Sequence, residues 1–169
     1  IDTQGVAQSQ AVAEQIFDNR INTDKLDPQL KLMTWTTLKE LTEAGHTIGA
    51  HGMRHNRLSK MNENDLKTEI IQSGEIIEEK IGGKVSWFAY AFGDIDSISA
   101  EALSIIFGRF NFCRTGIRGP NGKNSKWQFS DQLGLDQPFA YQKLILEGGL
   151  DFIYQNRRER FRRLVDKAN

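Results

Sequence analysis

The sequence predicts an α/β fold in which short parallel strands alternate with helices, and three observations support this prediction. From residue 34 to residue 116, helix-like stretches alternate with short apolar runs. These runs are apolar throughout, which is typical of parallel strands that are covered on both faces. Polar residues follow the ends of the runs, and sites in such folds form at the carboxyl ends of strands.

Composition and helix-ending residues indicate the elements of the first third of the chain. Thr34 is a good N-cap, and Gly45 is a good residue to end a helix. Asp27-Pro28 is a turn signal. The expected elements are, in order, a helix over residues 6–18, a loop over 19–33, a helix between Thr34 and Gly45, and a short buried strand over 46–50.

The longest expected helix covers residues 62–81. Asn62 or Asn64 can cap its first turn, and Gly82-Gly83 ends it. Its apolar residues share one inner stripe, formed by Leu66, Ile70, Ile77 and Ile81. The elements expected after it are a strand over 84–93, a loop over 94–99, a helix over 99–110 capped by Ser99, a strand over 111–116, a loop over 117–127 and a late helix over 148–166.

Length and composition predict a single globular domain, residues 1–169, with one sizeable core. No apolar run approaches the roughly 18 residues that suggest a membrane span. The opening residues lack the basic and apolar regions of a signal peptide, so we expect none in this chain, and the compartment is left open. Cys113 lies in an apolar context and is expected to be a buried thiol rather than a nucleophile.

Positive charge gathers near the C-terminus, most clearly in RRERFRR, residues 157–163. A short basic cluster can bind phosphates or nucleic acid. Neither interleaved aromatic residues nor a nucleic-acid-binding motif accompanies this one. We therefore interpret it as a solvated helix face with Phe161, Leu164 and Val165 turned inward, and we expect no nucleic-acid partner.

Two histidines, His51 and His55, follow the first strand of the predicted alternation. Their i, i+4 spacing puts both imidazoles on the same side of a helical turn, and neutral imidazole is the commonest protein ligand of zinc-like metals. A pair of surface histidines is the alternative interpretation. Leu58 and Met61 can anchor the segment to the core, which favours a built site. His46 lies at the opposite end of the strand and is interpreted as structural or exposed.

Two segments resemble motifs of the polysaccharide deacetylase family of carbohydrate esterases. LKELTEAGHTIGAHGMRHNRLSKM, residues 38–61, resembles the family's second motif, in which a strand precedes two histidines separated by three residues, with a leucine soon after. WFAYAFGDIDS, residues 87–97, resembles the third motif, an aromatic-rich strand that ends in proline, an aromatic residue and glycine. The resemblance covers roughly residues 32–118.

This resemblance implies an incomplete or distorted (β/α) barrel, similar to a TIM barrel, and a metal-dependent hydrolase. His51 and His55 would be two of three protein ligands to a divalent metal, commonly zinc. The metal would polarise an acetamide carbonyl and lower the pKa of a bound water. The backbone N–H of Phe92 would help to form an oxyanion hole. The substrate would be a polysaccharide or glycoconjugate with N-acetylated sugars.

The chain departs from the family pattern in three places. The opening motif, which supplies the general base and the remaining metal ligand, is absent, and Asp2 is a poor substitute for it. Ala91 stands where proline is usual. No histidine follows His55, so the general acid of the last motif has no counterpart. These departures favour a central piece of a longer domain, with divergence into an inactive form as the other explanation.

Further candidate residues follow the ends of later strands. Arg114 and Asp94 are candidates for binding the substrate, with a surface or capping role as the alternative for each. Asp94 and Asp96 could also replace the missing carboxylate ligand. Trp127 and Tyr141 could stack on a sugar ring, although we expect both to pack in the core.

Two other functions remain open from the sequence. The first is hydrolysis of a small amide or ureide on the same fold. The second is a catalytically inactive relative that binds carbohydrate or serves a structural role. The sequence identifies neither the polymer nor the oligomeric state.

Overall fold

A computed structural model describes residues 32–123, 125–130 and 136–169. The chain divides into two compact units, Ile1–Thr37 and Leu38–Asn169. A helix over Trp35–Glu43 begins just before the second unit, and the later helices and strands all lie within that unit. The helix expected over 6–18 lies outside the described residues, as does Asp2.

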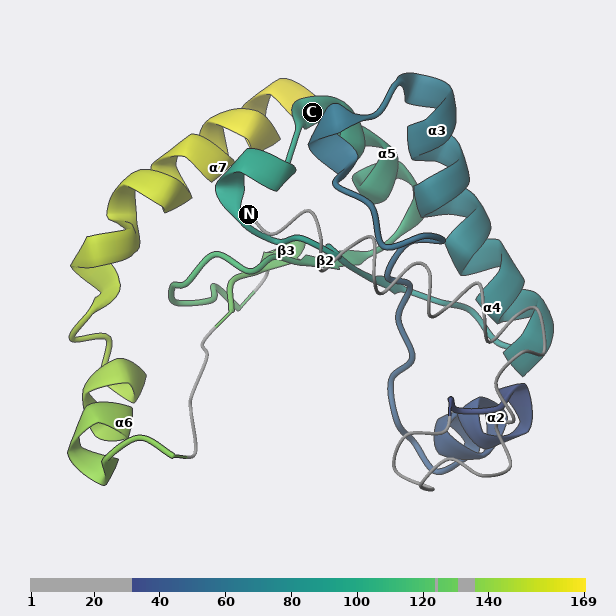
Figure 1. Ribbon diagram of the computed structural model, residues 1–169, viewed down its shortest axis with the longest axis horizontal. Coiled ribbons are helices and arrows are strands. Elements are labelled where there is room, and N and C mark those ends of the chain that lie inside the picture. Colours follow the sequence, from purple (N-terminus) through teal and green to yellow (C-terminus); the bar gives the residue numbers. More distant parts are fainter. Residues whose placement is uncertain (1–31, 124, 131–135) are drawn as a thin grey trace, which may run out of the picture. The chain divides into compact units, whose positions relative to one another are not determined.

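Among the described residues, helices and strands alternate between residues 73 and 114, whereas helices alone precede this stretch and a third strand and two α-helices follow it (Figure 1). The α-helices are α2 (Trp35–Glu43), α3 (Glu63–Lys67), α4 (Ser73–Ile81), α5 (Ala100–Arg109), α6 (Phe139–Leu146) and α7 (Gln155–Ala168). The strands are β1 (Trp87–Ala89), β2 (Phe112–Arg114) and β3 (Trp127–Gln128). Shorter helical turns cover Leu58–Lys60, Ile95–Ser97 and Asp151–Tyr154, and a π-helical turn covers Thr68–Gln72.

The three strands form a parallel sheet in the order β1-β2-β3. Phe88 at the centre of β1 pairs with Cys113 on β2, and on its other side it forms an isolated parallel bridge with Ala50. Ala89 N–H donates to the Ala50 carbonyl at 2.8 Å. The strand expected over 46–50 therefore contributes only this bridge. The predicted α/β class with parallel strands is confirmed, whereas a barrel stays an expectation, because the described residues form a sheet of only three strands.

The long helix expected over residues 62–81 is present as α3, the π-helical turn and α4 in direct succession. The Asn62 side chain caps it by accepting a hydrogen bond from Asp65 N–H at 3.0 Å. It ends at Gly82, whose φ of 75° lies in the left-handed region that glycine adopts without strain. The sequence did not indicate the π-helical turn, which inserts one residue and shifts the helix faces on either side of it.

The core lies where α5 contacts β2, α3 and α7. Ser99 caps α5 by accepting from Ala102 N–H at 3.2 Å, as the sequence predicted. Leu103 and Ile106 are fully buried on α5, and Phe161 is fully buried on α7. Because these side chains come from distant segments of the chain, burial of apolar surface between them holds the layers together.

Several details of the prediction are corrected by the structure. β3 falls where a loop was expected, and α6 falls where no regular element was expected. The late helix α7 begins at residue 155 and not at residue 148. Trp127 packs against the core as expected, but Tyr141 is 40% exposed, so its predicted core position is wrong. Cys113 is a buried free thiol, as predicted, and burial raises its pKa, so it stays protonated and unreactive.

Among the described residues, no helix combines the length and the apolar character needed to cross a bilayer.

Candidate functional site

His51 lies at the carboxyl end of the parallel sheet, directly after the Ala50 bridge. Its Nδ1 atom is 3.0 Å from the Ala89 carbonyl oxygen at the end of β1. A carbonyl oxygen only accepts hydrogen bonds, so Nδ1 is the donor in this bond. In a neutral ring Nε2 then has the lone pair, which is the arrangement found when a histidine ligates a metal through one nitrogen and is oriented through the other.

His55 is brought beside His51 by an unusual turn of the backbone. The turn contains Gly52 with φ 87° and His55 itself with φ 57°, which makes His55 the one described non-glycine residue in the left-handed region. The two imidazole centroids are 5.1 Å apart and the rings are inclined by 70°. Both side chains are exposed. The two imidazoles therefore lie side by side and accessible, as the i, i+4 spacing suggested. A strained loop brings them together, and not the helical turn that the sequence analysis expected.

The distance between the rings allows the two histidines to share one ion. A zinc–nitrogen bond of about 2.0–2.1 Å places a ring centroid roughly 3.2 Å from the metal, so tetrahedral ligands have centroids about 5 Å apart. The observed 5.1 Å separation of His51 and His55 agrees with this value. The donor chemistry and the spacing of His51 and His55 therefore fit two of the four ligand positions around a single tetrahedral metal ion.

Phe92 adjoins the histidines in the loop that follows β1. Its ring centroid lies 5.0 Å from that of His55, and the Arg57 guanidinium lies over the Phe92 ring at 4.6 Å from its centroid. Its backbone N–H has no acceptor among the described residues. Gly93 then meets Gly116 across the strand ends, where Gly116 N–H donates to the Gly93 carbonyl at 2.9 Å. This contact fixes the backbone on which Phe92 lies.

Asp94, a candidate substrate or metal ligand, is engaged with Arg57 at 3.1 Å and accepts from the Ser97 hydroxyl at 2.7 Å. It also caps the short turn Ile95–Ser97 through Asp96 N–H. Partial burial opposes ionisation of this carboxyl, but the Ser97 hydrogen bond and the Arg57 charge outweigh it and lower the pKa of Asp94. The capping role that the sequence offered as the alternative is present.

Asp96 pairs with Arg160 on α7 at 2.7 Å. Within the part of the chain that the structure describes, no group of three or more histidine, cysteine, aspartate or glutamate side chains is arranged to hold a metal. Among these residues, therefore, no carboxylate or thiol joins His51 and His55 in a three-donor set.

Arg114, the other candidate for binding substrate, is the last residue of β2. It is the register partner of Ala89, and its carbonyl accepts from Tyr90 N–H at 3.1 Å. The side chain is exposed, with Ser130 Oγ at 3.5 Å. The Arg114 Cα therefore lies at the same carboxyl end of the sheet as Ala89, whose carbonyl bonds to His51. This is the placement expected from parallel strands.

Sequence reasoning missed Glu69. Its carboxylate is buried and accepts hydrogen bonds from the loop between His51 and His55. A signal was present, because Glu69 lies on the inner stripe between Leu66 and Ile70, where a charged residue is unexpected. A charge on a buried helix face indicates a polar partner inside the fold.

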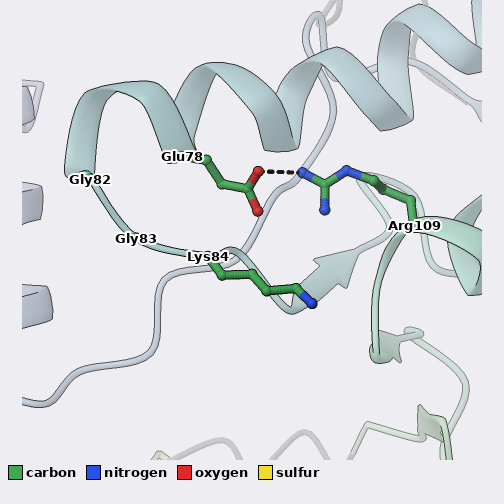
Figure 2. Close-up of a pocket in the computed structure, with 5 residues that line it drawn as sticks. All are labelled: Glu78, Gly82, Gly83, Lys84 and Arg109. Atoms are coloured by element: carbon green, nitrogen blue, oxygen red, sulfur yellow. Dashed lines mark hydrogen bonds and ion pairs between the residues drawn. The ribbon is translucent and has the colours of Figure 1, made fainter.

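A separate open pocket lies at the opposite end of β1 (Figure 2). Glu78 and Arg109 form an ion pair at 2.8 Å across it, and Lys84 lies beside them. The second Glu78 oxygen accepts from Val85 N–H at 2.8 Å, just before β1 begins. This pocket is at the amino end of the strand, away from His51, and its charges tie α4, α5 and the start of β1 together.

One arginine of the basic cluster at residues 157–163 has a structural role. Arg158 is buried and donates to the Arg118 carbonyl at 3.1 Å and the Asp151 carbonyl at 2.8 Å. Phe161 and Val165 face the core, with Leu164 partly buried beside them, which confirms the helix-face interpretation. The absence of a nucleic-acid partner stays a prediction.

Comparison with known proteins finds both a family model and a solved structure that are similar to this chain. The sequence model of the family described as polysaccharide deacetylase matches residues 7–105, a stretch that includes both histidines and Phe92 but not Arg114. A polysaccharide deacetylase from Bacillus cereus is a similar solved structure, with 17% identity and a TM-score of 0.49. The similarity covers 68% of this chain and 42% of the Bacillus cereus chain. No protein of curated function matches this chain.

Proposed function

We propose a function from the premise that this chain belongs to the polysaccharide deacetylase family, whose model matches more than half of its length. We propose that residues 1–169 belong to one domain of this type, although they form two compact units, and that the chain provides part of a site that removes acetyl groups from N-acetylated sugars. In that reaction the amide C–N bond breaks, and water supplies the oxygen of the acetate and a proton for the amine.

The roles of the chain's residues follow from their contacts. His51, oriented by Ala89, and His55 would hold a divalent ion, with zinc the expected metal. The chemistry that such an ion supplies is a lowered pKa for water and polarisation of the acetamide carbonyl. Phe92 N–H would donate to the oxygen that becomes negative as water attacks. Arg114 and Asp94, at the same strand ends, would contact the sugar.

The observation that carries this proposal is the geometry of the histidine pair. Two accessible imidazoles have centroids 5.1 Å apart, and one is oriented by a backbone carbonyl at 3.0 Å. His55 also has a left-handed φ of 57°, a conformation that is uncommon for a residue with a side chain and that clusters at functional sites. We propose that the remaining metal ligand comes from outside the described residues.

A binding protein without catalytic activity is the second candidate. Asp94 and Asp96 are both engaged in ion pairs, and no three-donor cluster exists among the described residues. A relative that keeps the histidines but lacks a complete ligand set would bind a sugar without cleaving it.

The experiment compares the purified chain with its His51→Ala/His55→Ala double variant. Metal content is measured by elemental analysis, and acetate release is measured on chito-oligosaccharides and on small amides. Zinc in the wild type but not in the variant, with acetate released from the oligosaccharides, supports the deacetylase. Release from small amides alone shifts the substrate class, and sugar binding without turnover supports the inactive relative. Unchanged metal content and activity in the variant would overturn the proposal.

A further inference from the structure

Glu69 lies on the π-helical turn beneath the histidine loop, which we define as residues 52–56. Its residue surface is only 1% exposed. One carboxylate oxygen accepts from Met53 N–H at 2.8 Å and from Arg54 N–H at 3.1 Å. The other accepts from the Asn56 side-chain amide at 3.3 Å. These three donors come from positions on both sides of His55.

The histidine loop has a backbone that local preferences do not favour. Gly52 has φ 87° and His55 has φ 57°, and left-handed conformation in a residue with a side chain persists only when its surroundings impose it. A Cβ atom at Gly52 would lie 3.1 Å from the Glu69 carboxylate, so the loop and the carboxylate are in close contact. Glu69 is the buried group that faces this turn.

We propose that Glu69 is a positioning residue for the histidine pair: its carboxylate fixes the loop conformation that brings the His55 imidazole beside that of His51. In this role Glu69 would act through the loop and would not be a ligand of the metal or a contact of the substrate. This inference rests on the proposed function, since the role of Glu69 matters only if His51 and His55 bind one ion together. The structural claim, that Glu69 places His55, can be tested without any metal.

A carboxylate suits this role for a physical reason. It offers several acceptor sites and no donor, so one group satisfies three donors that point into the fold. Charge-assisted hydrogen bonds are roughly twice as strong as neutral ones. The neighbouring Leu66 and Ile70 are fully buried and hold the helix in place, so the carboxylate is a fixed anchor for the loop.

The test uses the metal-free chain first, because it contains only three histidines and its imidazole spectrum is therefore simple. Long-range ¹H–¹⁵N correlation spectra report the tautomer of each ring, and nuclear Overhauser contacts report the proximity of His51 and His55. Zn²⁺ affinity is then measured by competition with a chromophoric chelator. The variants are Glu69→Leu, Glu69→Gln and, as the matched control, Glu75→Leu, which removes an exposed carboxylate from α4.

In Glu69→Leu, the His55 signals move and the contact between the two rings is lost. The His51 signals keep their tautomer, because Ala89 still holds that ring. Zn²⁺ affinity falls about 10- to 100-fold, as is usual when a group that orients a ligand is removed. Glu69→Gln retains the ring contact and most of the affinity, since its carbonyl can accept from both backbone donors while the Asn56 amide flips. Glu75→Leu behaves as the wild type.

A second variant guards against misfolding of Glu69→Leu. Gly52→Ala strains the same loop at a partly exposed position without removing a core contact, and it is expected to separate the rings in a folded protein. Unchanged ring contacts and unchanged Zn²⁺ affinity in folded Glu69→Leu or, where that variant does not fold, in folded Gly52→Ala would overturn the inference and leave the proposed function intact. Lost ring contacts in a chain whose wild type binds no Zn²⁺ would support the positioning role and count against the proposed function.

Discussion

The Nδ1 atom of His51 lies 3.0 Å from the carbonyl oxygen of Ala89. This hydrogen bond joins the histidine to the carboxyl end of β1 and fixes both the tautomer and the direction of the ring. Because β1 is itself paired on both sides, the anchor belongs to the rigid part of the fold. The other ring of the pair, His55, depends instead on a loop.

Removal of His51 is expected to abolish Zn²⁺ binding. A single remaining imidazole leaves an exposed site with weak affinity, since each ligand adds a bond that the ion otherwise makes to water. Equilibrium dialysis with elemental analysis would measure the bound metal in His51→Ala. His46→Ala is the matched control, because His46 is an exposed histidine on the same segment. Equal loss of Zn²⁺ in both variants would show that the metal is not bound by this pair.

Gly93→Ala is expected to destabilise the fold by about 3 kcal/mol, because overpacking against backbone cannot be relieved by a rotamer change. A Cβ atom at Gly93 would overlap the Gly116 nitrogen and come within 2.8 Å of its Cα. Gly108→Ala is the matched control: nothing lies within 4 Å of its added Cβ, so helix propensity should stabilise α5 by up to about 1 kcal/mol. Urea denaturation of both variants checks the opposite signs. Similar stability of the two would contradict the close approach.

Arg57→Ala is expected to raise the pKa of Asp94 towards its ordinary value. The Arg57 guanidinium pairs with Asp94 and donates to the Ser97 hydroxyl, and it stacks over the Phe92 ring. NMR titration of the Asp94 carboxyl would measure the change. Arg54→Ala is the matched control, since only the backbone of Arg54 takes part in a described hydrogen bond. An unaltered Asp94 titration in Arg57→Ala would show that the Ser97 and Asp96 hydrogen bonds alone lower this pKa.

Glu78→Gln is expected to lower stability near neutral pH but much less in acid. The Val85 N–H bond, against opposing burial, and the Arg109 charge lower the pKa of Glu78. Figure 2 shows the ion pair between the Glu78 and Arg109 side chains. A depressed folded pKa gives stability that is present above the unfolded pKa and lost as the pH falls through the folded value. The side chain is 29% exposed, so the loss at about pH 7 should be about 1 kcal/mol.

Thermal melts of Glu78→Gln and wild type at about pH 7 and about pH 3 would measure this effect. The difference in Tm should shrink towards zero at the lower pH. Glu75→Gln should show no difference at either pH. A Glu78→Gln difference that stays constant down to about pH 3 would mean that packing, rather than ionisation, accounts for the effect.

Helix ends were predictable because they depend on neighbouring residues. Asn62 and Ser99 cap their helices through backbone N–H groups three residues away, and Gly82 ends a helix by its own conformational freedom. The apolar pattern likewise predicted the parallel strands β1 and β2. In both cases the information lies within a few residues along the chain.

Other features were not readable for the opposite reason. β3 has two residues, and it is a strand because Cys113 N–H reaches the Lys126 carbonyl from β2. Tyr141 looked like a core residue by type, but its helix α6 leaves it exposed. The position of Glu69 on the inner stripe of its helix signals a buried charge, but only the position of the 52–56 loop beside it shows what it binds.

The sequence by itself determined that the chain is α/β, that its helices begin and end at particular caps, and that His51 and His55 follow a short apolar run with a spacing typical of metal ligands. Tertiary structure alone decided how the two imidazoles meet. Their 5.1 Å separation depends on a carbonyl from residue 89 and, we infer, on a carboxylate from residue 69. Hydrogen bonds between such distant residues form only after the core has packed, so no local pattern in the sequence encodes them.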